Sequence, residues 1–464
     1  MRRALGLAVA LSAAWLLAMA LPTGATDLID AWRAAQQHDL DYAAARAAQQ
    51  AGAAKRSQAA ALWRPSVVLT GTAGVGGSDS SATGAQFSAP GLGTSAGVAF
   101  DTSVNRGALG RWALAASLPL LSRERNAQGR QLELSADVSD LEWQNAQQTL
   151  MLDTAQRYFD VVLASDSLRV LRQQQAAVEQ ALLETQDRFR LGDAPVTDTH
   201  EAAARSGSIA AQRLALETDL QLKQADFTDA TGMPPAAALL LPPTVGARPA
   251  DAQALEFWLS EAELRNPQLR MQITAVEVAR QEAAKFSGAL SPSVDLVAQV
   301  GREHLSGSGD FGSASNRAGS RMIGVQLSVP LYTGGMRSAR QQEALHGIEK
   351  AQAQADRTRQ QVTQKTRTAW LGLAVGGGRV AALSQALVSS RSRLDATRLG
   401  RQVGDRTTLD LLNAENDAAS AELTLLQARI ELLMNRLRLA AAAGRLDEAW
   451  LQSVNASLQN SRSR

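Results

Sequence analysis

The feature that most constrains this chain is an internal duplication. The stretch "RPSVVL" at Arg64 returns as "SPSVDL" at Ser291, 227 positions later, whereas Gly192 and Gly404 stand 212 positions apart. The offset falls from 227 to 212 within a single segment, which is longer in the first copy. Two copies with one length difference predict two similar supersecondary units and a tolerant surface loop at that segment.

Each copy contains two runs in which apolar residues alternate with small or polar ones. The runs are residues 66–75, 112–118, 293–300 and 322–329. Alternation of period two, bounded by glycine and proline, predicts strands with one apolar face. Residues 76–106 and 303–320 are rich in glycine and serine and predict flexible, solvated loops within each strand pair.

Long helical stretches follow the strands. Residues 121–190 contain no proline and a single glycine, which predicts a rod of roughly 100 Å at ~1.5 Å per residue. Apolar residues on a seam of alternating three and four spacing are Val138, Leu141, Leu152, Ala155, Phe159 and Val162, and later Leu423, Leu426, Ile430, Leu433, Leu437 and Ala440. Asn145 and Gln148 interrupt the first seam. Such seams predict partner helices.

Three consecutive glycines, residues 376–378, lie inside the second long helical stretch. Each costs about 1 kcal/mol relative to alanine in a helix interior. They predict a kink or a very close helix contact, and an interruption without functional meaning is the competing interpretation.

The N-terminal residues have the pattern of a secretory signal peptide. Arg2 and Arg3 precede an apolar run at residues 4–21, and small residues offer cleavage after Ala20 or Ala25. A retained membrane anchor is the alternative. The expected organisation is a leader at 1–25, a first repeat at 26–233, a proline-rich connector at 234–253, a second repeat at 254–446 and a C-terminal tail at 447–464.

Composition excludes several classes of function. Loss of Arg2 and Arg3 takes the formal charge from +2 to 0, which gives no electrostatic case for nucleic acid. The chain has no cysteine, so disulfides, thiol catalysis and thiolate metal sites are impossible. The four histidines are scattered without ligand spacing, and no phosphate loop or activated nucleophile is visible. We therefore expect no enzyme, no metal and no cofactor.

The four strands pose a physical problem if their apolar faces meet lipid. An open sheet edge would leave backbone groups unpaired in hydrocarbon, and only a closed barrel avoids this. A barrel needs about eight strands or more, so one chain is too small. The physics alone leaves open an eight-stranded barrel in a dimer and a twelve-stranded barrel in a trimer.

Several motifs, in their order and spacing, are similar to those of the TolC-like outer-membrane channel proteins. They are "DLIDAWRAAQQHDLDYAAAR", the strand ends "LPL" and "VPLYTGG", two G-D turns, "ELRNPQLR" and "AAAGRL". The resemblance covers nearly all of the chain after the leader. It implies an α+β membrane protein of two structural repeats with a long α-helical barrel. Each protomer would give four transmembrane β-strands to a homotrimer that closes a 12-stranded β-barrel.

The resemblance also implies partners and a location. The β-barrel would lie in outer-membrane lipid, and the helices would extend into the periplasm. The trimer would meet an inner-membrane ABC-type transporter through a periplasmic adaptor, and its substrate would leave the cell in one step.

The two G-D turns are the candidate functional site. Gly192 and Gly404 can end helices in a left-handed conformation, and Pro195 suits the first turn of the next helix. Thr407 and Asp410 have the spacing of a helix start. From the residues alone, Asp198 and Asp410 are expected to complement helix N-termini.

The resemblance assigns these turns to the periplasmic tip, where the tunnel closes. It implies that Arg406 pairs with Asp198, beside Thr197, and that Asp410 forms an aspartate ring at the entrance. A second family ring falls on Asn413, which is not an acid, and a constriction tyrosine falls on Arg401. The family's gating bonds are therefore matched only in part.

The sequence leaves the transport substrate open. The opening stretch resembles the type I secretion branch, and it favours export of a repeat-in-toxin protein of the adenylate cyclase-hemolysin kind. Multidrug efflux is the alternative within the family. A periplasmic coiled-coil adaptor without a pore is the alternative from another class, but it does not explain two amphipathic strand pairs.

Overall fold

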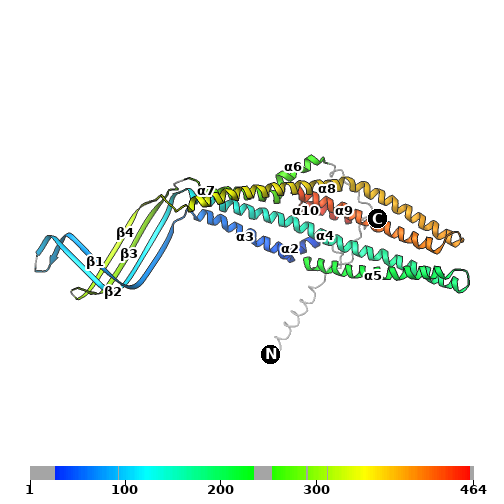
Figure 1. Cartoon of the computed structure of the whole chain (residues 1–464), viewed down its shortest axis with the longest axis horizontal. Coiled ribbons are helices and arrows are strands. Elements are labelled where there is room, and N and C mark those ends of the chain that lie inside the picture. Colours follow the sequence, from blue (N-terminus) through cyan, green and yellow to red (C-terminus); the bar gives the residue numbers. More distant parts are fainter. Residues whose placement is uncertain (1–26, 92, 235–252, 289–290, 311, 460–464) are drawn as a thin grey trace, which may run out of the picture. The chain divides into compact units, whose positions relative to one another are not determined.

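The computed structural model describes residues 27–91, 93–234, 253–288, 291–310 and 312–459 (Figure 1). The first half contains α2 (Leu28–His38), α3 (Leu40–Ala61), β1 (Ser66–Ala89), β2 (Gly93–Ser122), α4 (Arg123–Arg190) and α5 (Val196–Thr231). The second half contains α6 (Leu255–Arg265), α7 (Pro267–Phe286), β3 (Ser293–Gly309), β4 (Gly312–Ser328), α8 (Met336–Gln402), α9 (Thr408–Ala442) and then α10 (Glu448–Gln459). The expected leader and nearly all of the expected connector lie outside the described residues.

Both halves have the same order of elements: two helices, two strands, one very long helix and a further helix. The exact repeat and connector boundaries stay a prediction. The residues also group into two compact units by contact. One unit consists of Gln50–Asp140 and Gln272–Ala355. The other consists of Met1–Gln49, Leu141–Met271 and Asp356–Arg464.

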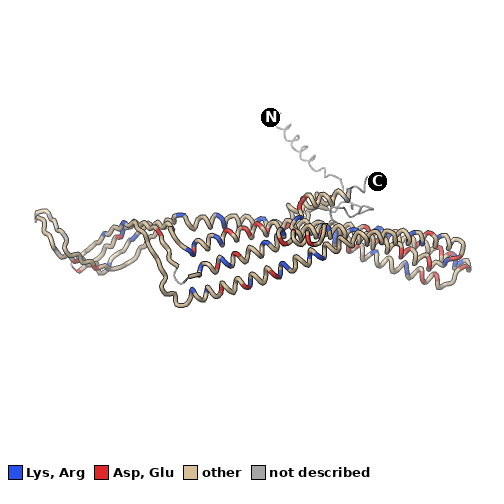
Figure 2. Tube along the Cα trace, turned by 90° about the horizontal axis from the view of Figure 1, so that it is seen from above, with Lys and Arg blue, Asp and Glu red and all other residues tan. Residues whose placement is uncertain are grey.

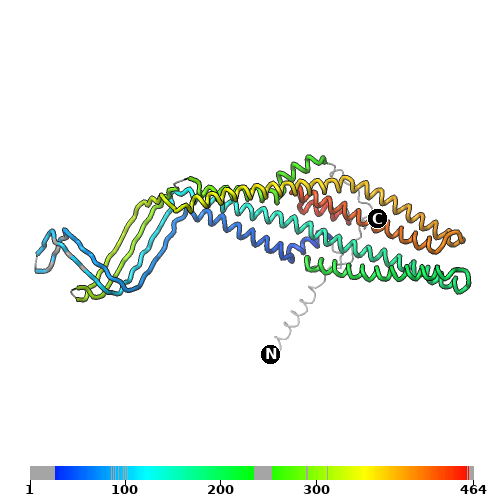
Figure 3. The backbone as a smooth tube through the Cα atoms, viewed as in Figure 1, coloured from blue at the N-terminus to red at the C-terminus, as the bar shows by residue number. Residues whose placement is uncertain are grey.

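The strands form one antiparallel sheet in the order β1-β2-β3-β4 (Figure 3). They are longer than the sequence predicts, because residues 76–106 and 303–320, which we expected to be flexible loops, belong mostly to the strands. Only residues 90–92 and 310–311 separate the paired strands. That part of the prediction is wrong, because backbone hydrogen bonds of an antiparallel ladder continue through glycine and serine that lack an alternating pattern.

The β1–β2 hairpin is the longer of the two, and its register shifts at Gly76/Ser78, Ala82/Ala85 and Ala85/Phe87. Each shift skips one residue on one strand and two on the other, which bends the hairpin locally. The longer segment in the first copy is therefore a longer hairpin rather than an irregular loop.

The register confirms that the alternating apolar residues share one face of the sheet. Leu69 pairs with Leu114, Leu114 with Val300, and Leu296 with Val325. We call this the apolar face; it carries Val67, Leu69 and Val75 of β1, Leu114 and Leu118 of β2, Val294, Leu296 and Val300 of β3, and Ile323, Val325 and Leu327 of β4. The opposite face carries the acids Asp295 and Glu303. Glu303 Oε2 lies 4.0 Å from Arg111 Nε on the same face.

Most residues of the predicted helical seams are buried against partner helices, and Val138, Leu152 and Leu423 are partly buried. Phe159 of α4 and Leu437 of α9 are fully buried in one cluster that also contains Leu28 of α2 and Leu451 of α10. A second cluster joins Trp258 of α6 to α8 and α9. Most of the stabilisation of such long helices comes from this packing rather than from helix propensity.

Helix α8 passes through the three glycines without a break. An added Cβ at Gly372 would lie 2.4 Å from Asn435 Nδ2, and one at Gly376 would lie 2.8 Å from Leu432 Cδ1, whereas Gly378 has nothing within 4 Å. The helix is not kinked there; Gly376 and Gly372, one turn earlier, make close contacts with α9, whereas Gly378 makes none. By length and composition α8 could also cross a membrane, but one helix of this kind is weak evidence for a span.

The expected C-terminal tail contains a packed helix. Asn455 of α10 accepts a hydrogen bond from the Leu28 amide at 3.2 Å and donates to Asp27 at 2.9 Å. The same helix buries Leu451 and Val454 completely. The last helix thus fixes the first described helix, α2.

Candidate functional site

The two helical turns have the same backbone geometry. Gly192 has φ 85° and Gly404 has φ 82°, both in the left-handed region. Asp193 N–H donates to Arg188 O at 2.8 Å, and Asp405 N–H donates to Gly400 O at 2.8 Å. Each turn is a Schellman motif, which satisfies helix-end carbonyls and reverses the chain. Both glycines thus adopt the left-handed conformation that ends a helix.

The helix that follows the second turn begins with a capping box. Thr407 Oγ1 accepts from Asp410 N–H at 3.1 Å, and Asp410 Oδ2 accepts from Thr407 N–H at 3.0 Å. The bond from the Thr407 N–H, together with one that Thr407 Oγ1 donates to the same carboxylate oxygen at 2.9 Å, lowers the pKa of Asp410, and the nearby Arg406 adds to the shift. Within the protomer, Asp410 therefore complements the start of α9, as its position after Thr407 predicts.

The first turn starts its helix differently. Pro195 is the N-cap of α5 rather than a first-turn residue, so our placement of it is wrong by one position. Its carbonyl accepts from Asp198 N–H at 3.2 Å. Asp198 lies in the first turn and is half-buried, while Thr197 is exposed. A carboxylate at this position complements the partial positive charge of a helix N-terminus.

Arg406 folds back over the end of α8. A Cβ at Gly400 would lie 2.7 Å from Arg406 Cγ, so glycine at that position makes room for the arginine stem. In the described part of the protomer, Arg406 and Asp198 do not form an ion pair. Sequence reasoning missed Gly400, although "RLGRQVGDR" places a second glycine one helical turn before Gly404.

Arg401 connects two helices. It forms an ion pair with Glu184 of α4, and its side chain is only 15% exposed, against 42% for Glu184. Burial lowers the pKa of Arg401 from its ordinary value. The position that the resemblance gives to a tyrosine thus holds a buried cation that links α8 to α4.

Glu422 of α9 is a junction that the sequence analysis missed. Its carboxylate accepts from Arg169 of α4 at 3.0 Å and from Arg391 of α8 at 2.6 Å. Burial alone would raise its pKa, but these two guanidinium groups lower it overall. Further pairs, Arg398–Glu415 and Arg379–Glu431, join α8 to α9. Charges of both signs follow one another along these helices (Figure 2).

Asn413 lies at a groove between α5 and α9. The groove has a volume of about 420 Å³ and is lined by Glu201, Ala204, Arg205 and Ser208 of α5 and Leu409, Leu412 and Asn413 of α9. Asn413 is exposed, and its amide is uncharged at the position where the family's second ring carries an acid. The groove brings the start of α5 close to the start of α9 within one protomer.

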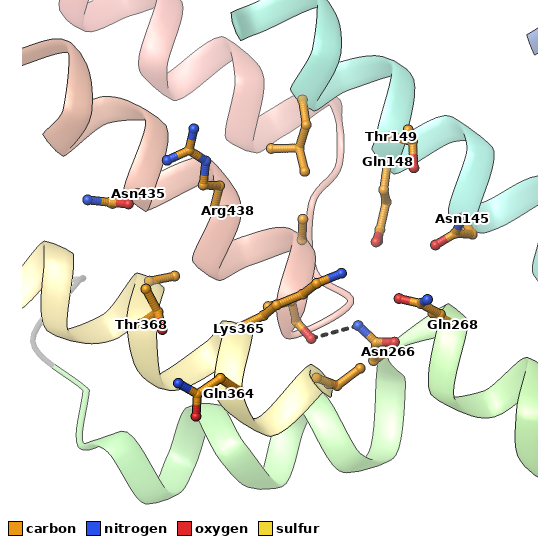
Figure 4. A pocket seen from close by; sticks show the side chains of 15 residues that line it. Asn145, Gln148, Thr149, Asn266, Gln268, Gln364, Lys365, Thr368, Asn435 and Arg438 are labelled. Carbon is orange, nitrogen blue, oxygen red and sulfur yellow. Dashed lines mark hydrogen bonds between the residues drawn. The ribbon is translucent and has the colours of Figure 1, made fainter. Parts of the chain in front are cut away.

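A polar cavity of about 620 Å³ lies between α4, α8 and α9, next to the start of α7 (Figure 4). Asn145 and Gln148, the two residues that interrupt the α4 seam, line it together with Asn266. Lys365 extends its ammonium group into the cavity, as Figure 4 shows. The polar interruptions of the seam are therefore the wall of this cavity.

The architecture defines a class of protein. A sheet with one apolar face, joined to very long paired helices that reverse at matched turns, is typical of outer-membrane channels whose helices extend into the periplasm. The described residues contain no group of three or more acidic or histidine side chains that could hold a metal ion.

Comparisons with known proteins agree with this class. The model of the family described as "Outer membrane efflux protein" matches residues 32–233 and 258–445, and the chain belongs to this family. It is 31% identical to the outer membrane protein TolC of Escherichia coli over 335 residues, covering 70% of this chain and 67% of that protein. It is 29% identical to the alkaline protease secretion protein AprF of Pseudomonas aeruginosa over 341 residues, which cover 73% of this chain and 70% of that protein.

A solved structure shares the fold. The outer membrane protein VceC of Vibrio cholerae superposes with a TM-score of 0.72 at 18% identity, covering 90% of this chain and 96% of that one. The protein is thus an α+β outer-membrane channel for efflux or secretion, of the TolC-like kind, and not an enzyme. The fold, class and location that the resemblance implied are confirmed.

Proposed function

We propose that three copies of this chain close a 12-stranded β-barrel in the outer membrane. The sheet of one protomer is open, with β1 and β4 at its edges. An apolar face in hydrocarbon cannot leave such edges unpaired. Pairing β4 of one protomer with β1 of the next satisfies both edges, and three protomers supply the twelve strands that the family resemblance implies.

We further propose that the trimer works with a periplasmic adaptor and an inner-membrane ABC-type transporter in type I secretion of a protein. The observation that carries this proposal is the similarity to AprF, which is named for the secretion of alkaline protease. Export of small molecules is the second candidate, favoured by the family description, which names efflux.

Deletion of the gene separates the two candidates. Type I secretion predicts that a protein normally found in the medium stays in the cells while drug resistance is unchanged. Drug sensitivity with normal protein secretion would contradict it and favour efflux. Complementation with the wild-type gene is the control.

We propose that the two turns form the gate of the tunnel. Six turns from three protomers would ring its entrance, and Asp410 would contribute three carboxylates to a cation-binding ring. Arg406, held against Gly400, would meet Asp198 of a neighbouring protomer, since the two do not pair within the described protomer. Arg401 and Glu184 would hold the α8 and α4 ends together in the closed state, in place of the tyrosine link.

Conductance in planar bilayers tests the gate. Arg406→Ser should raise the single-channel conductance, whereas Arg357→Ser, an exposed arginine of α8 far along the helix from the turn, should not. Equal conductance of wild type and Arg406→Ser would remove Arg406 from the lock. Asp410→Asn keeps the shape and an acceptor for the cap but removes the charge, so block by trivalent cations should weaken; undiminished block would exclude the ring.

A further inference from the structure

Arginines gather on the apolar face of the sheet at the end of the apolar rows. Arg302 of β3 and Arg317 and Arg321 of β4 occupy the same face as Val300 and Leu114, by register. The apolar rows lie nearer the ends of the strands that join α3, α4, α7 and α8, and the arginines lie nearer the hairpin turns. Because the helices extend into the periplasm, this end of the sheet belongs to the outer leaflet.

The three arginines form a compact group. Arg302 pairs directly with Gly319, so Arg317 and Arg321 are its two diagonal neighbours on β4. Diagonal neighbours on one face are about 7–8 Å apart, within reach of long side chains. Gly319 lies between the two β4 arginines, and a Cβ added there would meet only the Gly301 carbonyl oxygen, at 4.0 Å, so no side chain separates the two arginines on this face.

The group lacks a carboxylate of its own. On this face, between positions 67–75, 108–118, 294–308 and 313–327, the strands carry no aspartate or glutamate. The nearby acid Glu303 lies on the opposite face, beside Arg111. Among the described residues, none of the three arginines forms an ion pair. Like charges this close need an anion from outside the sheet.

The surroundings fit a lipid headgroup. Trp112, 43% exposed, pairs directly with Arg302, and His304 pairs with Arg317. Tryptophan is enriched at membrane–water interfaces, and an arginine on the lipid face costs little there but several kcal/mol at the midplane. By register Arg321 shares the last apolar row with Val300 and Leu114, and Arg302 and Arg317 lie one and two rows nearer the hairpin turns, at the level of the headgroups above the acyl chains.

We infer that Arg302, Arg317 and Arg321 form a binding site for the phosphate groups of a phosphorylated outer-leaflet glycolipid, the lipid A part of lipopolysaccharide. Guanidinium groups bind phosphate oxygens through paired, charge-assisted hydrogen bonds. A ligand with phosphates above several acyl chains matches a cationic group above an apolar face. The site rests on the proposed barrel, which turns the apolar face toward lipid, but not on the identity of the exported substrate.

The probe is bisphosphorylated lipid A added to the purified full chain in detergent, with bound lipid counted by native mass spectrometry. Arg302→Ser/Arg317→Ser/Arg321→Ser should weaken retention roughly 100-fold, at about fivefold for each basic residue near a membrane surface. The matched control is Arg111→Ser, on the opposite face of the same sheet, which should bind as wild type does. The corresponding triple lysine variant keeps the charge but loses the paired guanidinium bonds, so its retention should lie between that of wild type and that of the serine variant.

Two further arms use only the wild-type protein, so they hold even if the serine variant does not fold. Dephosphorylated lipid A should be retained far less than the bisphosphate. Equal retention of both would show that acyl contacts alone hold the lipid and would overturn the site. Equal retention of phosphatidylglycerol would mean that any anionic lipid suffices and would overturn the assignment to a glycolipid.

Discussion

The close contact between α8 and α9 gives a graded prediction at three glycines of one helix. Alanine is favoured over glycine in a helix interior by about 1 kcal/mol. Gly378→Ala should gain this amount, because nothing lies within 4 Å of the new Cβ. Gly376→Ala should be near neutral, because the 2.8 Å contact is with Leu432 Cδ1, the end of a flexible side chain.

Gly372→Ala should be destabilising. Its new Cβ would lie 2.4 Å from Asn435 Nδ2 and 2.8 Å from Asn435 Cγ, so the amide must move. Asn435 is 9% exposed, and displacing a buried amide costs about 1–3 kcal/mol. The helix gain offsets about 1 kcal/mol of this cost, so Gly372→Ala and Gly378→Ala should differ by about 1–3 kcal/mol.

Hydrogen–deuterium exchange of the α8 amides around these glycines measures the difference locally, without requiring reversible unfolding of the whole channel. Protection should be about 5- to 150-fold lower in Gly372→Ala than in Gly378→Ala. Equal protection in the two variants would refute the close contact at Gly372. A loss of protection in Gly378→Ala would show that another surface covers that position.

Three further predictions concern the helix starts and the ion pairs. Thr407→Ala should destabilise the first turn of α9 by about 1 kcal/mol, seen as faster amide exchange there, whereas an unchanged rate would mean that the capping box contributes nothing. Because the folded-state pKa of Asp410 is lowered, the ionised carboxylate stabilises the first turn of α9 fully above the ordinary aspartate pKa of about 4, and this stabilisation is lost as the pH falls through the lower folded value. Amide protection of that turn should therefore fall with pH in wild type but not in Asp410→Asn. Glu422→Gln should lower the free energy of unfolding by about 1–2 kcal/mol, since it removes the negative charge that pairs with one arginine of α4 and one of α8. A melting temperature equal to that of wild type would contradict this junction.

The sequence was sufficient for the order of the elements and for the face of each strand. Alternation at Val67, Leu114, Leu296 and Val325 placed these residues correctly on one face, because lipid or core contact imposes period two. The same criterion failed in the outer parts of the hairpins. There neither face needs to be apolar, so the glycine- and serine-rich segments carry no period even though they are paired strands.

The sequence predicted those features of the turns that depend on residues close together in the chain. Gly404 and the Thr407–Asp410 pair are read from neighbours within one helical turn. The contacts of Arg401 with Glu184 and of Glu422 with Arg169 join residues more than 200 positions apart. No short-range pattern encodes which arginine of a charged helix finds which acid, so these contacts needed the three-dimensional arrangement.

The most direct test of the account is whether the purified full chain forms a membrane pore. In planar bilayers of outer-membrane lipids, we predict discrete conductance steps of one size, produced by a species that migrates as a trimer before heating and as a monomer after it. A folded trimer that gives no steps at any protein concentration would contradict the channel. A pore formed by the monomer would contradict the shared barrel.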